Sequence, residues 1–385
     1  MNPMKKFTLT IIILFMTLIL TVCQNKKNLK EKQELSNKLQ SHVESIISNE
    51  GEFPIHNSVL LVDCPKIKWK GAAGKADGKN ELMTADHKIK LASIGKTFTA
   101  TVILQLYEDG YLKLDDTIDK YLDNPVVKLD SLMIYQGISY GREITIRQLL
   151  HHTSGISDYM EDQRFIPDVI ANPQKQYTPA KIMAIYYEYD TNHDALFPPG
   201  TDFNYSDVNY VLLAMIIEQV TGENYHSQLK SRIFDPLKMK NSFLEYYEEP
   251  RGKQPLSHAF YSTMDLVADV NTSFDWGGGG IISTCEELNT FFRALVDGKL
   301  FKKKETLKLM LETADEGLGG MDYDYGLGIM KRNLHGFIFY GHGGAYDCDV
   351  FYCPEKNVSV CMSLNQMETH GQRDEFLLDA IEFVL

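Results

Sequence analysis

The sequence has no excess of positive charge. Its 39 lysine and arginine residues are outnumbered by 52 aspartate and glutamate residues, which gives a formal net charge of −13. A chain this acidic has no electrostatic attraction for nucleic acid or for an anionic membrane surface, so we expect neither kind of binding. With 385 residues, 44% hydrophobic and 24% charged, it has the composition of a globular protein of one large domain or two intimately joined ones.

Cysteine is scarce and shows neither a disulfide framework nor a metal-binding pattern. None of the six cysteines has the spacing to a histidine that a zinc site requires. If Cys23 is modified, at least one of the other five must stay free. We therefore expect the remaining cysteines to fill the core, and we expect no metal and no cofactor.

Long apolar runs are confined to the N-terminus. Lys5 and Lys6 precede a mostly apolar run that ends at Cys23, as in a secretory signal segment. Residues 1–23 are predicted to be a signal peptide. Leu20-Thr21-Val22-Cys23 resembles a bacterial lipobox, in which the cysteine is lipidated, although the residue before the cysteine is usually small. The alternatives are an ordinary cleaved signal or an uncleaved anchor. Each of these predicts export to the periplasm or cell envelope.

The rest of the chain predicts an α+β fold. Residues 24–37 are polar and predict a tether, and an apolar repeat from Leu35 to Ile47 predicts a helix. Strands are expected near both ends of the domain, which spans residues 38–385. They are expected at residues 58–62, 67–74, 325–331, 337–340, 349–353 and 358–364, and helices at 93–109, 145–155, 207–220, 225–234, 285–297 and 374–384. This order predicts an antiparallel sheet flanked by helices, with a mainly helical lobe inserted at roughly residues 100–275.

Ser93-Ile94-Gly95-Lys96 is the most informative motif. On a helix, side chains three residues apart share a face, so the Lys96 amine can reach the Ser93 hydroxyl. A serine in a first helical turn also lies near the positive end of the helix dipole. The competing hypothesis is a phosphate-binding loop ending in Gly95-Lys96-Thr97, but that motif needs glycine where this chain has Lys90.

Further motifs occur in a consistent order along the chain. Together with the tetrad they resemble those of the penicillin-recognising serine hydrolases, specifically the class C β-lactamase and D-alanyl-D-alanine carboxypeptidase group. The motifs are Leu149-Leu150-His151-His152-Thr153-Ser154-Gly155, Pro198-Pro199-Gly200, Phe203-Asn204-Tyr205-Ser206-Asp207, Ile233-Phe234-Asp235-Pro236-Leu237, Gly278-Gly279-Gly280 and Gly341-His342-Gly343-Gly344. The resemblance implies a β-lactamase/transpeptidase-like fold.

The resemblance also implies the roles of individual residues. Ser93 would be the nucleophile, Lys96 its proton-accepting partner, and Tyr205 a base or proton shuttle tuned by the Lys96 ammonium. The backbone N–H groups of Ser93 and Ala345 would form the oxyanion hole. His342 would border the cleft.

Other residues would line the cleft or support it. Gly343 and Gly344 would let substrate approach the backbone. His151 and His152 are assigned no catalytic role, because adjacent helical residues do not face each other. Trp276, Tyr323 and Tyr325 are expected to be either cleft walls or core.

One position departs from the family pattern. Asp207 stands where the family usually has asparagine, and an ionised carboxylate can only accept hydrogen bonds. It would stabilise a charged Lys96 and so weaken that lysine as a base. We therefore place Asp207 among the substrate-binding residues and expect it to reduce β-lactam hydrolysis.

These residues predict an exported serine hydrolase that forms an acyl-enzyme on Ser93. The expected substrates are D-Ala-D-Ala-type peptides or related amides, including peptidoglycan. The alternatives are a β-lactamase or small-ester esterase, or a penicillin-binding or sensory protein with little turnover. Fold and motifs do not separate these substrates, and the sequence does not define the oligomeric state.

Overall fold

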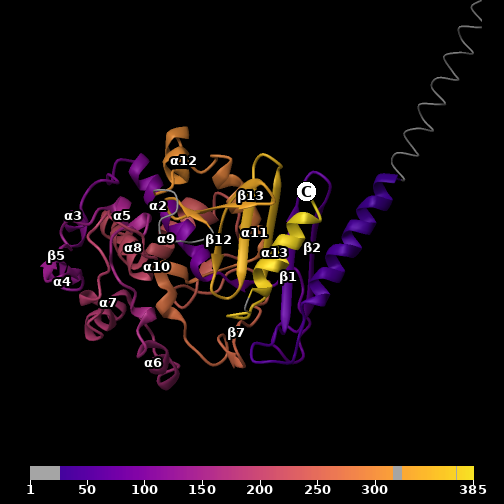
Figure 1. The fold of residues 1–385 in the computed structure, drawn as a ribbon, viewed down its shortest axis with the longest axis horizontal. Coiled ribbons are helices and arrows are strands. Elements are labelled where there is room, and N and C mark those ends of the chain that lie inside the picture. Colours follow the sequence, from indigo (N-terminus) through magenta and orange to yellow (C-terminus); the bar gives the residue numbers. More distant parts are fainter. Residues whose placement is uncertain (1–26, 315–322, 370) are drawn as a thin grey trace, which may run out of the picture.

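The computed structural model describes residues 27–314, 323–369 and 371–385. The predicted signal peptide and Cys23 therefore lie outside the described residues. An antiparallel seven-stranded sheet organises one half of the molecule (Figure 1). In spatial order its strands are β10 (Asp324–Tyr325), β11 (Met330–Leu334), β12 (Phe337–Gly344), β13 (Cys348–Cys353), β14 (Val358–Ser363), β1 (Asn57–Asp63) and β2 (Lys68–Gly74).

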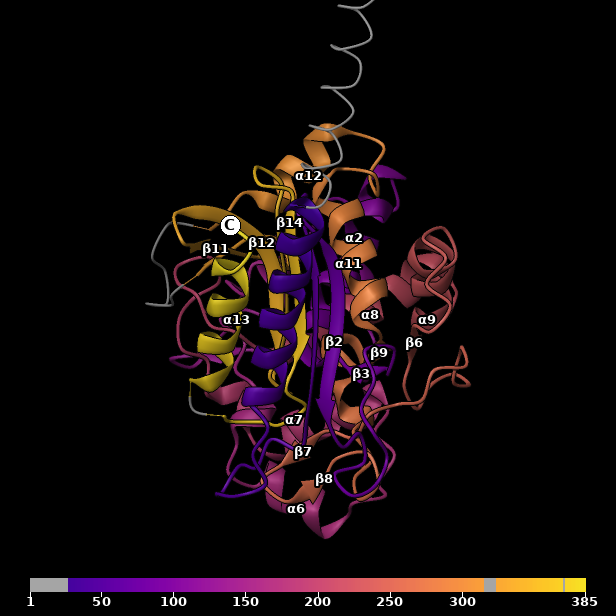
Figure 2. The same ribbon diagram turned by 90° about the vertical axis from the view of Figure 1, so that its right-hand side faces the viewer.

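Both faces of the sheet are covered. A helix over residues 27–45 and helix α13 (Gln372–Glu382) lie against one face, as Figure 2 shows, and α11 (Cys285–Val296) packs on the other. Strand β1 contributes to both cores. Leu60 and Val62 belong to the cluster beneath the terminal helices, whereas Val59 and Leu61 belong to the larger cluster of the other face. A strand buried on both faces needs a continuous apolar run, which explains the sequence Val59-Leu60-Leu61-Val62.

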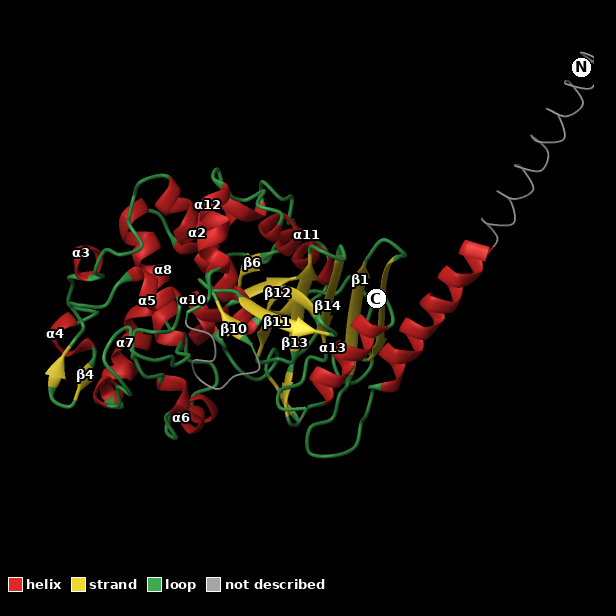
Figure 3. Cartoon of the chain, turned by 45° about the horizontal axis from the view of Figure 1, so that its top comes forward, coloured by secondary structure: helices red, strands yellow, loops and turns green. Residues whose placement is uncertain are grey.

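The second half of the molecule is a mainly helical lobe (Figure 3). Its central helices are α2 (Gly95–Glu108) and α8 (Asp207–Thr221), which contact each other and α10. The remaining helices of the described chain are α3 (Asp119–Leu122), α4 (Leu129–Leu132), α5 (Ile146–Leu150), α6 (Phe165–Ala171), α7 (Pro179–Glu188), α9 (Tyr225–Leu229), α10 (Trp276–Gly279) and α12 (Lys304–Leu311).

Short strands connect the two halves. The three-stranded sheet has the order β3 (Ile89–Lys90), β9 (Ile281–Ser283), β6 (Phe243–Leu244). Two hairpins complete the described strands: β4 (Ile134–Tyr135) with β5 (Ile138–Ser139), and β7 (Phe260–Tyr261) with β8 (Met264–Asp265). The α+β prediction and the helical insertion between sheet segments agree with this architecture.

Three local predictions differ from the structure. The segment predicted as a polar tether is helical from residue 27. The single strand predicted over residues 325–331 is two strands, because the chain turns at Gly328, whose φ is +75°. The helix predicted over residues 225–234 changes from α9 to a π-helix at Lys230–Phe234. Local capping was predicted correctly: Thr145 and Gln148 form the capping box of α5.

All five cysteines in the described part of the chain are free and buried, as expected for core residues. Among the described residues, no helix combines the length and the apolar character needed to cross a bilayer.

Candidate active site

Ser93 lies at the junction of the sheet half and the helical lobe. It belongs to a short 3-10 helix (Ala92–Ile94) that follows β3 and leads directly into α2. Ala92 has a positive φ of 44°, a conformation that a residue with a Cβ atom rarely adopts. Glycine is required opposite this bend, because a Cβ atom on Gly279 would lie 2.7 Å from the carbonyl carbon of Ala92.

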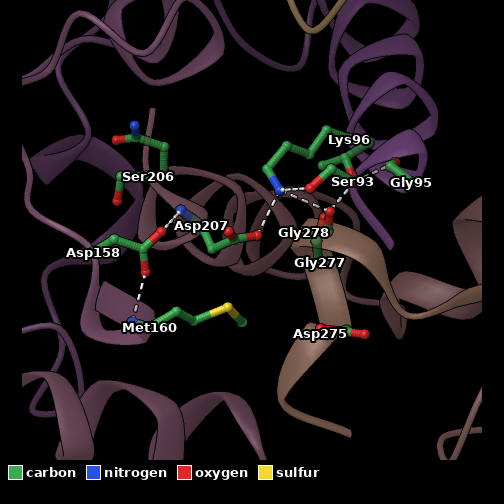
Figure 4. A network of polar contacts seen from close by, with 12 residues as sticks. Ser93, Gly95, Lys96, Asp158, Met160, Ser206, Asp207, Asp275, Gly277 and Gly278 are labelled. Carbon is green, nitrogen blue, oxygen red and sulfur yellow. Dashed lines mark hydrogen bonds and ion pairs between the residues drawn. The ribbon is translucent and has the colours of Figure 1, made fainter. Parts of the chain in front are cut away.

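Lys96 is completely buried and contacts three oxygen atoms. Its Nζ lies 3.0 Å from Ser93 Oγ, 2.5 Å from Asp207 Oδ1 and 3.1 Å from the carbonyl oxygen of Gly278 (Figure 4). An ammonium has three N–H donors, and here each can be matched with one acceptor. The geometry therefore suits a charged lysine. A charged Lys96 can accept a proton from Ser93 only if it gives another proton away. Asp207 Oδ1, at 2.5 Å from Nζ, is placed to receive that proton.

Asp207 is the first residue of α8, and its backbone is held by Asp158, a residue that the sequence analysis did not single out. Asp158 accepts hydrogen bonds from the backbone N–H of Asp207, at 2.7 Å, and from that of Met160, at 3.0 Å (Figure 4). Burial, and next the carboxylate of Asp207, raise the pKa of Asp158. Two carboxyl groups and one ammonium therefore share a small buried volume. Asp158 follows the Gly155 motif closely, and its capping of the turn at residues 159–161 was the local signal available.

Tyr205 comes from the helical lobe and lines the same cavity as Ser93. Its hydroxyl is buried and makes no hydrogen bond of normal geometry among the described residues, but it interacts with the Ser93 side chain. Burial, and next the Asp207 carboxylate, raise its pKa well above the ordinary value, so Tyr205 is a neutral phenol. From the sequence we expect the Lys96 ammonium to set the pKa of Tyr205. Burial and the Asp207 carboxylate are the main causes of its raised pKa, although Lys96 Nζ lies 4.8 Å from the centroid of the Tyr205 ring.

His152 holds the Tyr205 ring in place. The two rings are stacked with their centroids 4.2 Å apart. His152 is fully buried and its Nδ1 faces the backbone N–H of Ser206 at 3.1 Å and the side-chain amide of Asn209 at 3.0 Å. Burial lowers its pKa well below the ordinary value, so the ring is neutral and Nδ1 accepts these hydrogen bonds. That His152 takes no direct part in catalysis stays a prediction, and these contacts give it a positioning role.

Strand β12 supplies the opposite wall of the cavity. Gly343, Gly344 and Ala345 line it together with Ser93 and Tyr205, around a volume of about 420 Å³. The glycines are required, because a Cβ atom on Gly344 would lie 2.2 Å from the carbonyl oxygen of Leu91. The backbone of Ala345 is thus close to Ser93, as an oxyanion hole needs, and that assignment stays a prediction.

The His342 side chain lies beside Tyr205, with the two ring centroids 6.4 Å apart, and is not among the residues that line the cavity. The ring is fully buried, with Nδ1 2.6 Å from the carbonyl oxygen of Gly343 and Nε2 2.9 Å from Tyr325 Oη. Burial lowers its pKa to about 3, so it is neutral and accepts from Tyr325. Side chains alternate along a strand, so His342 and Gly344 share the face of β12 that is turned toward Leu91 and the helical lobe. The role of His342 in substrate binding stays a prediction, and its contacts show that it packs between Tyr205 and Tyr325.

The three aromatic residues that the sequence left as either cleft wall or core occupy different positions. Tyr323 lines the cavity. Tyr325 is buried against His342, and Trp276 is buried against Tyr225 and Tyr247, so both belong to the core.

The low pKa of His342 predicts a specific loss of stability in acid. An unfolded histidine titrates near 6.5 and the folded one near 3, so the unfolded state binds the proton first as the pH falls. The contribution of neutral His342 to the free energy of unfolding should be fully present above pH 6.5 and should be lost as the pH falls from 6.5 to 3. Between pH 7.5 and 5.0 we expect wild type to lose about 2 kcal/mol more unfolding free energy than His342→Gln. Urea titrations at both pH values measure this, and equal losses would contradict the assignment.

Comparison with known proteins matches this chain and its fold to one family. The Beta-lactamase family model matches residues 57–381. A putative penicillin-binding protein, PbpX of Bacillus subtilis (strain 168), is 27% identical over 79% of this chain and 69% of its own length. A D-aminopeptidase of Brucella anthropi is 25% identical over 80% of this chain, which spans only 55% of that longer protein.

Solved structures agree. The crystal structure of a D-stereospecific amidohydrolase from Streptomyces sp. is 30% identical, has a TM-score of 0.73, and the match covers 91% of this chain and 98% of that one. The D-amino acid amidase of Ochrobactrum anthropi SV3 shares the fold, with a TM-score of 0.71 at 22% identity over 91% of this chain and 98% of that one. The chain therefore belongs to the β-lactamase family, the penicillin-recognising serine hydrolases that its motifs resemble.

Proposed function

We propose that this protein hydrolyses peptides or amides through an acyl-enzyme on Ser93, with D-Ala-D-Ala-type peptides or related amides as substrates. The observation that carries the proposal is the contact of Lys96 Nζ with both Ser93 Oγ and Asp207 Oδ1, in a cavity that Tyr205 also lines. Relatives named as a D-aminopeptidase and a D-stereospecific amidohydrolase support amide bonds as the target.

The proton route follows from the contacts. As Ser93 Oγ attacks the substrate carbonyl carbon, its proton moves to Lys96, which passes one to Asp207 over the 2.5 Å contact. Charge then develops on the carbonyl oxygen, where the N–H groups of Ser93 and Ala345 would stabilise it. The leaving nitrogen takes a proton from the neutral phenol of Tyr205, which regains one from the Lys96–Asp207 pair. The proton of Ser93 thus leaves with the amine, and water then cleaves the ester.

A second candidate function is covalent capture of a β-lactam with little turnover, as in a penicillin-binding or sensory protein. The observation that favours it is the Lys96–Asp207 ion pair, because a carboxylate that holds the ammonium charged weakens the lysine as a base. Relatives named as penicillin-binding proteins are consistent with it. Hydrolysis of β-lactams or small esters remains the other alternative within the family.

The proposal includes a location in the cell envelope. The apolar segment before Cys23 supports export, and lipidation at Cys23 would anchor the domain to the membrane. Peptidoglycan stem peptides would be within reach there.

Labelling Ser93 tests the proposal. We expect a fluorophosphonate and a fluorescent penicillin to label wild type and not Ser93→Ala, because only the hydroxyl at this position is activated. Mass spectrometry of the labelled peptide identifies the residue. Release of the penicillin label over time, together with ammonia or peptide release from D-amino acid amides, distinguishes the hydrolase from the capture protein. Equal labelling of both variants would remove Ser93 from the mechanism.

A further inference from the structure

A second cavity adjoins the nucleophile, and it differs from the first in chemistry. It has a volume of about 280 Å³ and is lined by Ala92, which precedes Ser93, and by Ala345, which also lines the first cavity. The two cavities therefore meet beside Ser93, where the scissile carbonyl must lie for Ser93 to attack it. A substrate bound there has one substituent on each side.

The walls of this second cavity are mostly apolar. Helix α6 contributes Phe165 and Ile166, and the β7–β8 hairpin with the segment after it contributes Met264 and Leu266. Figure 2 shows α6 beside this hairpin at the lower end of the molecule. Ile166 and Ile170, one turn apart on α6, line the cavity and are about half exposed, at 49% and 50%. Apolar side chains left open at a cavity mouth favour an apolar occupant.

The first cavity is more polar than the second. Besides Ser93 and Tyr205 it is lined by charged residues, among them Glu161 and Arg373. The Arg373 guanidinium forms a bidentate ion pair with Asp349, at 2.6 and 2.7 Å. Tyr205 is the proton donor to the leaving nitrogen in the proposed function, so the leaving group lies on this polar side. The substituent on the acyl carbon is left to face the apolar cavity.

The size of the apolar cavity limits what fills it. One water molecule occupies about 30 Å³ in the liquid, so 280 Å³ far exceeds what the methyl group of alanine would fill. A phenyl ring or a branched aliphatic chain would displace water from apolar walls that cannot hydrogen-bond to it. Three methionines in the lining, at positions 160, 264 and 367, allow the walls to adapt to different shapes.

We propose that this cavity is the subsite for the acyl-side substituent, and that the substrate carries a large aromatic or branched aliphatic side chain next to the scissile carbonyl. The inference rests on the proposed amide-hydrolase function and narrows its substrate class. It therefore favours the related amides of the proposed function over D-Ala-D-Ala-type peptides, whose acyl residue carries only a methyl group.

The test compares D-phenylalaninamide, D-leucinamide and D-alaninamide by ammonia release. One methylene in an apolar pocket changes kcat/KM by about 10–200-fold, so we expect wild type to prefer the phenylalanine amide over the alanine amide by about 100-fold or more. The double variant Ile166→Asp/Ile170→Asp should lower this ratio about tenfold. Ile138→Asp, which places the same charge at a 55% exposed isoleucine of β5, should leave the ratio unchanged.

A binding measurement accompanies the kinetics. A boronic acid with a benzyl group on the carbon next to boron should protect Ser93 from fluorophosphonate at concentrations at least tenfold lower than its methyl analogue. Two kinetic results would overturn the subsite: no preference of wild type for D-phenylalaninamide over D-alaninamide, or a preference that the double variant leaves unchanged. If no amide is cleaved, equal protection of Ser93 by the benzyl and methyl boronic acids would overturn it. Unlabelled Ser93 would instead reject the proposed function, and the subsite with it. Labelled Ser93 with turnover of D-alaninamide but no preference would reject the subsite alone.

Discussion

Lys96→Met should lower kcat about 10²–10⁴-fold, the usual contribution of a positioned proton carrier. It should also lower the free energy of unfolding by about 3–5 kcal/mol, because the ammonium that compensates Asp207 is lost while the carboxylate stays in place. Lys96 is fully buried, so solvent cannot replace its charge. Steady-state kinetics on an amide substrate and urea unfolding measure the two effects separately.

The double variant Lys96→Met/Asp207→Asn separates catalysis from stability. Removing the carboxylate as well should restore most of the lost stability, because no unpaired charge remains, while activity stays low. Recovery of activity in the double variant would mean that Lys96 acts only as a structural counter-charge. An unchanged unfolding free energy in Lys96→Met would contradict the buried ion pair.

Tyr205→Phe should reduce kcat/KM by about 10²–10⁴-fold and leave stability unchanged or slightly higher. The hydroxyl is buried and makes no hydrogen bond of normal geometry among the described residues, so its removal deletes a desolvated polar group and loses only the interaction with Ser93. The ring would still stack on His152. The buried Tyr205 hydroxyl lowers the free energy of unfolding, and its position in the same cavity as Ser93 is best explained by a role in proton transfer.

Tyr210→Phe is the matched control. Tyr210 is more deeply buried than Tyr205, and its hydroxyl donates to the carbonyl oxygen of Leu150 at 2.9 Å. This substitution should cost about 1–3 kcal/mol of unfolding free energy and leave kcat/KM nearly unchanged. If Tyr205→Phe instead lost stability and kept activity, Tyr205 would be a core residue and the proton route would fail. Thermal unfolding and amide kinetics on both variants decide between these outcomes.

The sequence predicted the features that depend on neighbours in the chain. Thr145 and Gln148 form their predicted capping box, and Gly222 ends α8 in a left-handed conformation. The order of the motifs also predicted the family and the α+β fold. These signals are readable because a cap or a turn is decided within a few residues.

Other predictions failed for a reason that involves distant parts of the chain. The sequence did not show which side chains His342 would contact, and the structure places it against Tyr325 and Tyr205. The strand predicted over residues 325–331 looked continuous because its apolar pattern does not register the turn at Gly328. Asp158 was missed, since its capping of the turn at residues 159–161 is a local signal but its burial beside Asp207 is not.

The sequence by itself thus determined the family, the order of the elements and the residue types around Ser93. Only the tertiary structure decided how the charges meet. Lys96 and Asp207 are 111 residues apart and touch because α2 and α8 pack together. Likewise, the apolar cavity exists because α6 and the β7–β8 hairpin meet beside Ala345. Protonation and substrate fit depend on burial and distance, and packing between remote segments determines both.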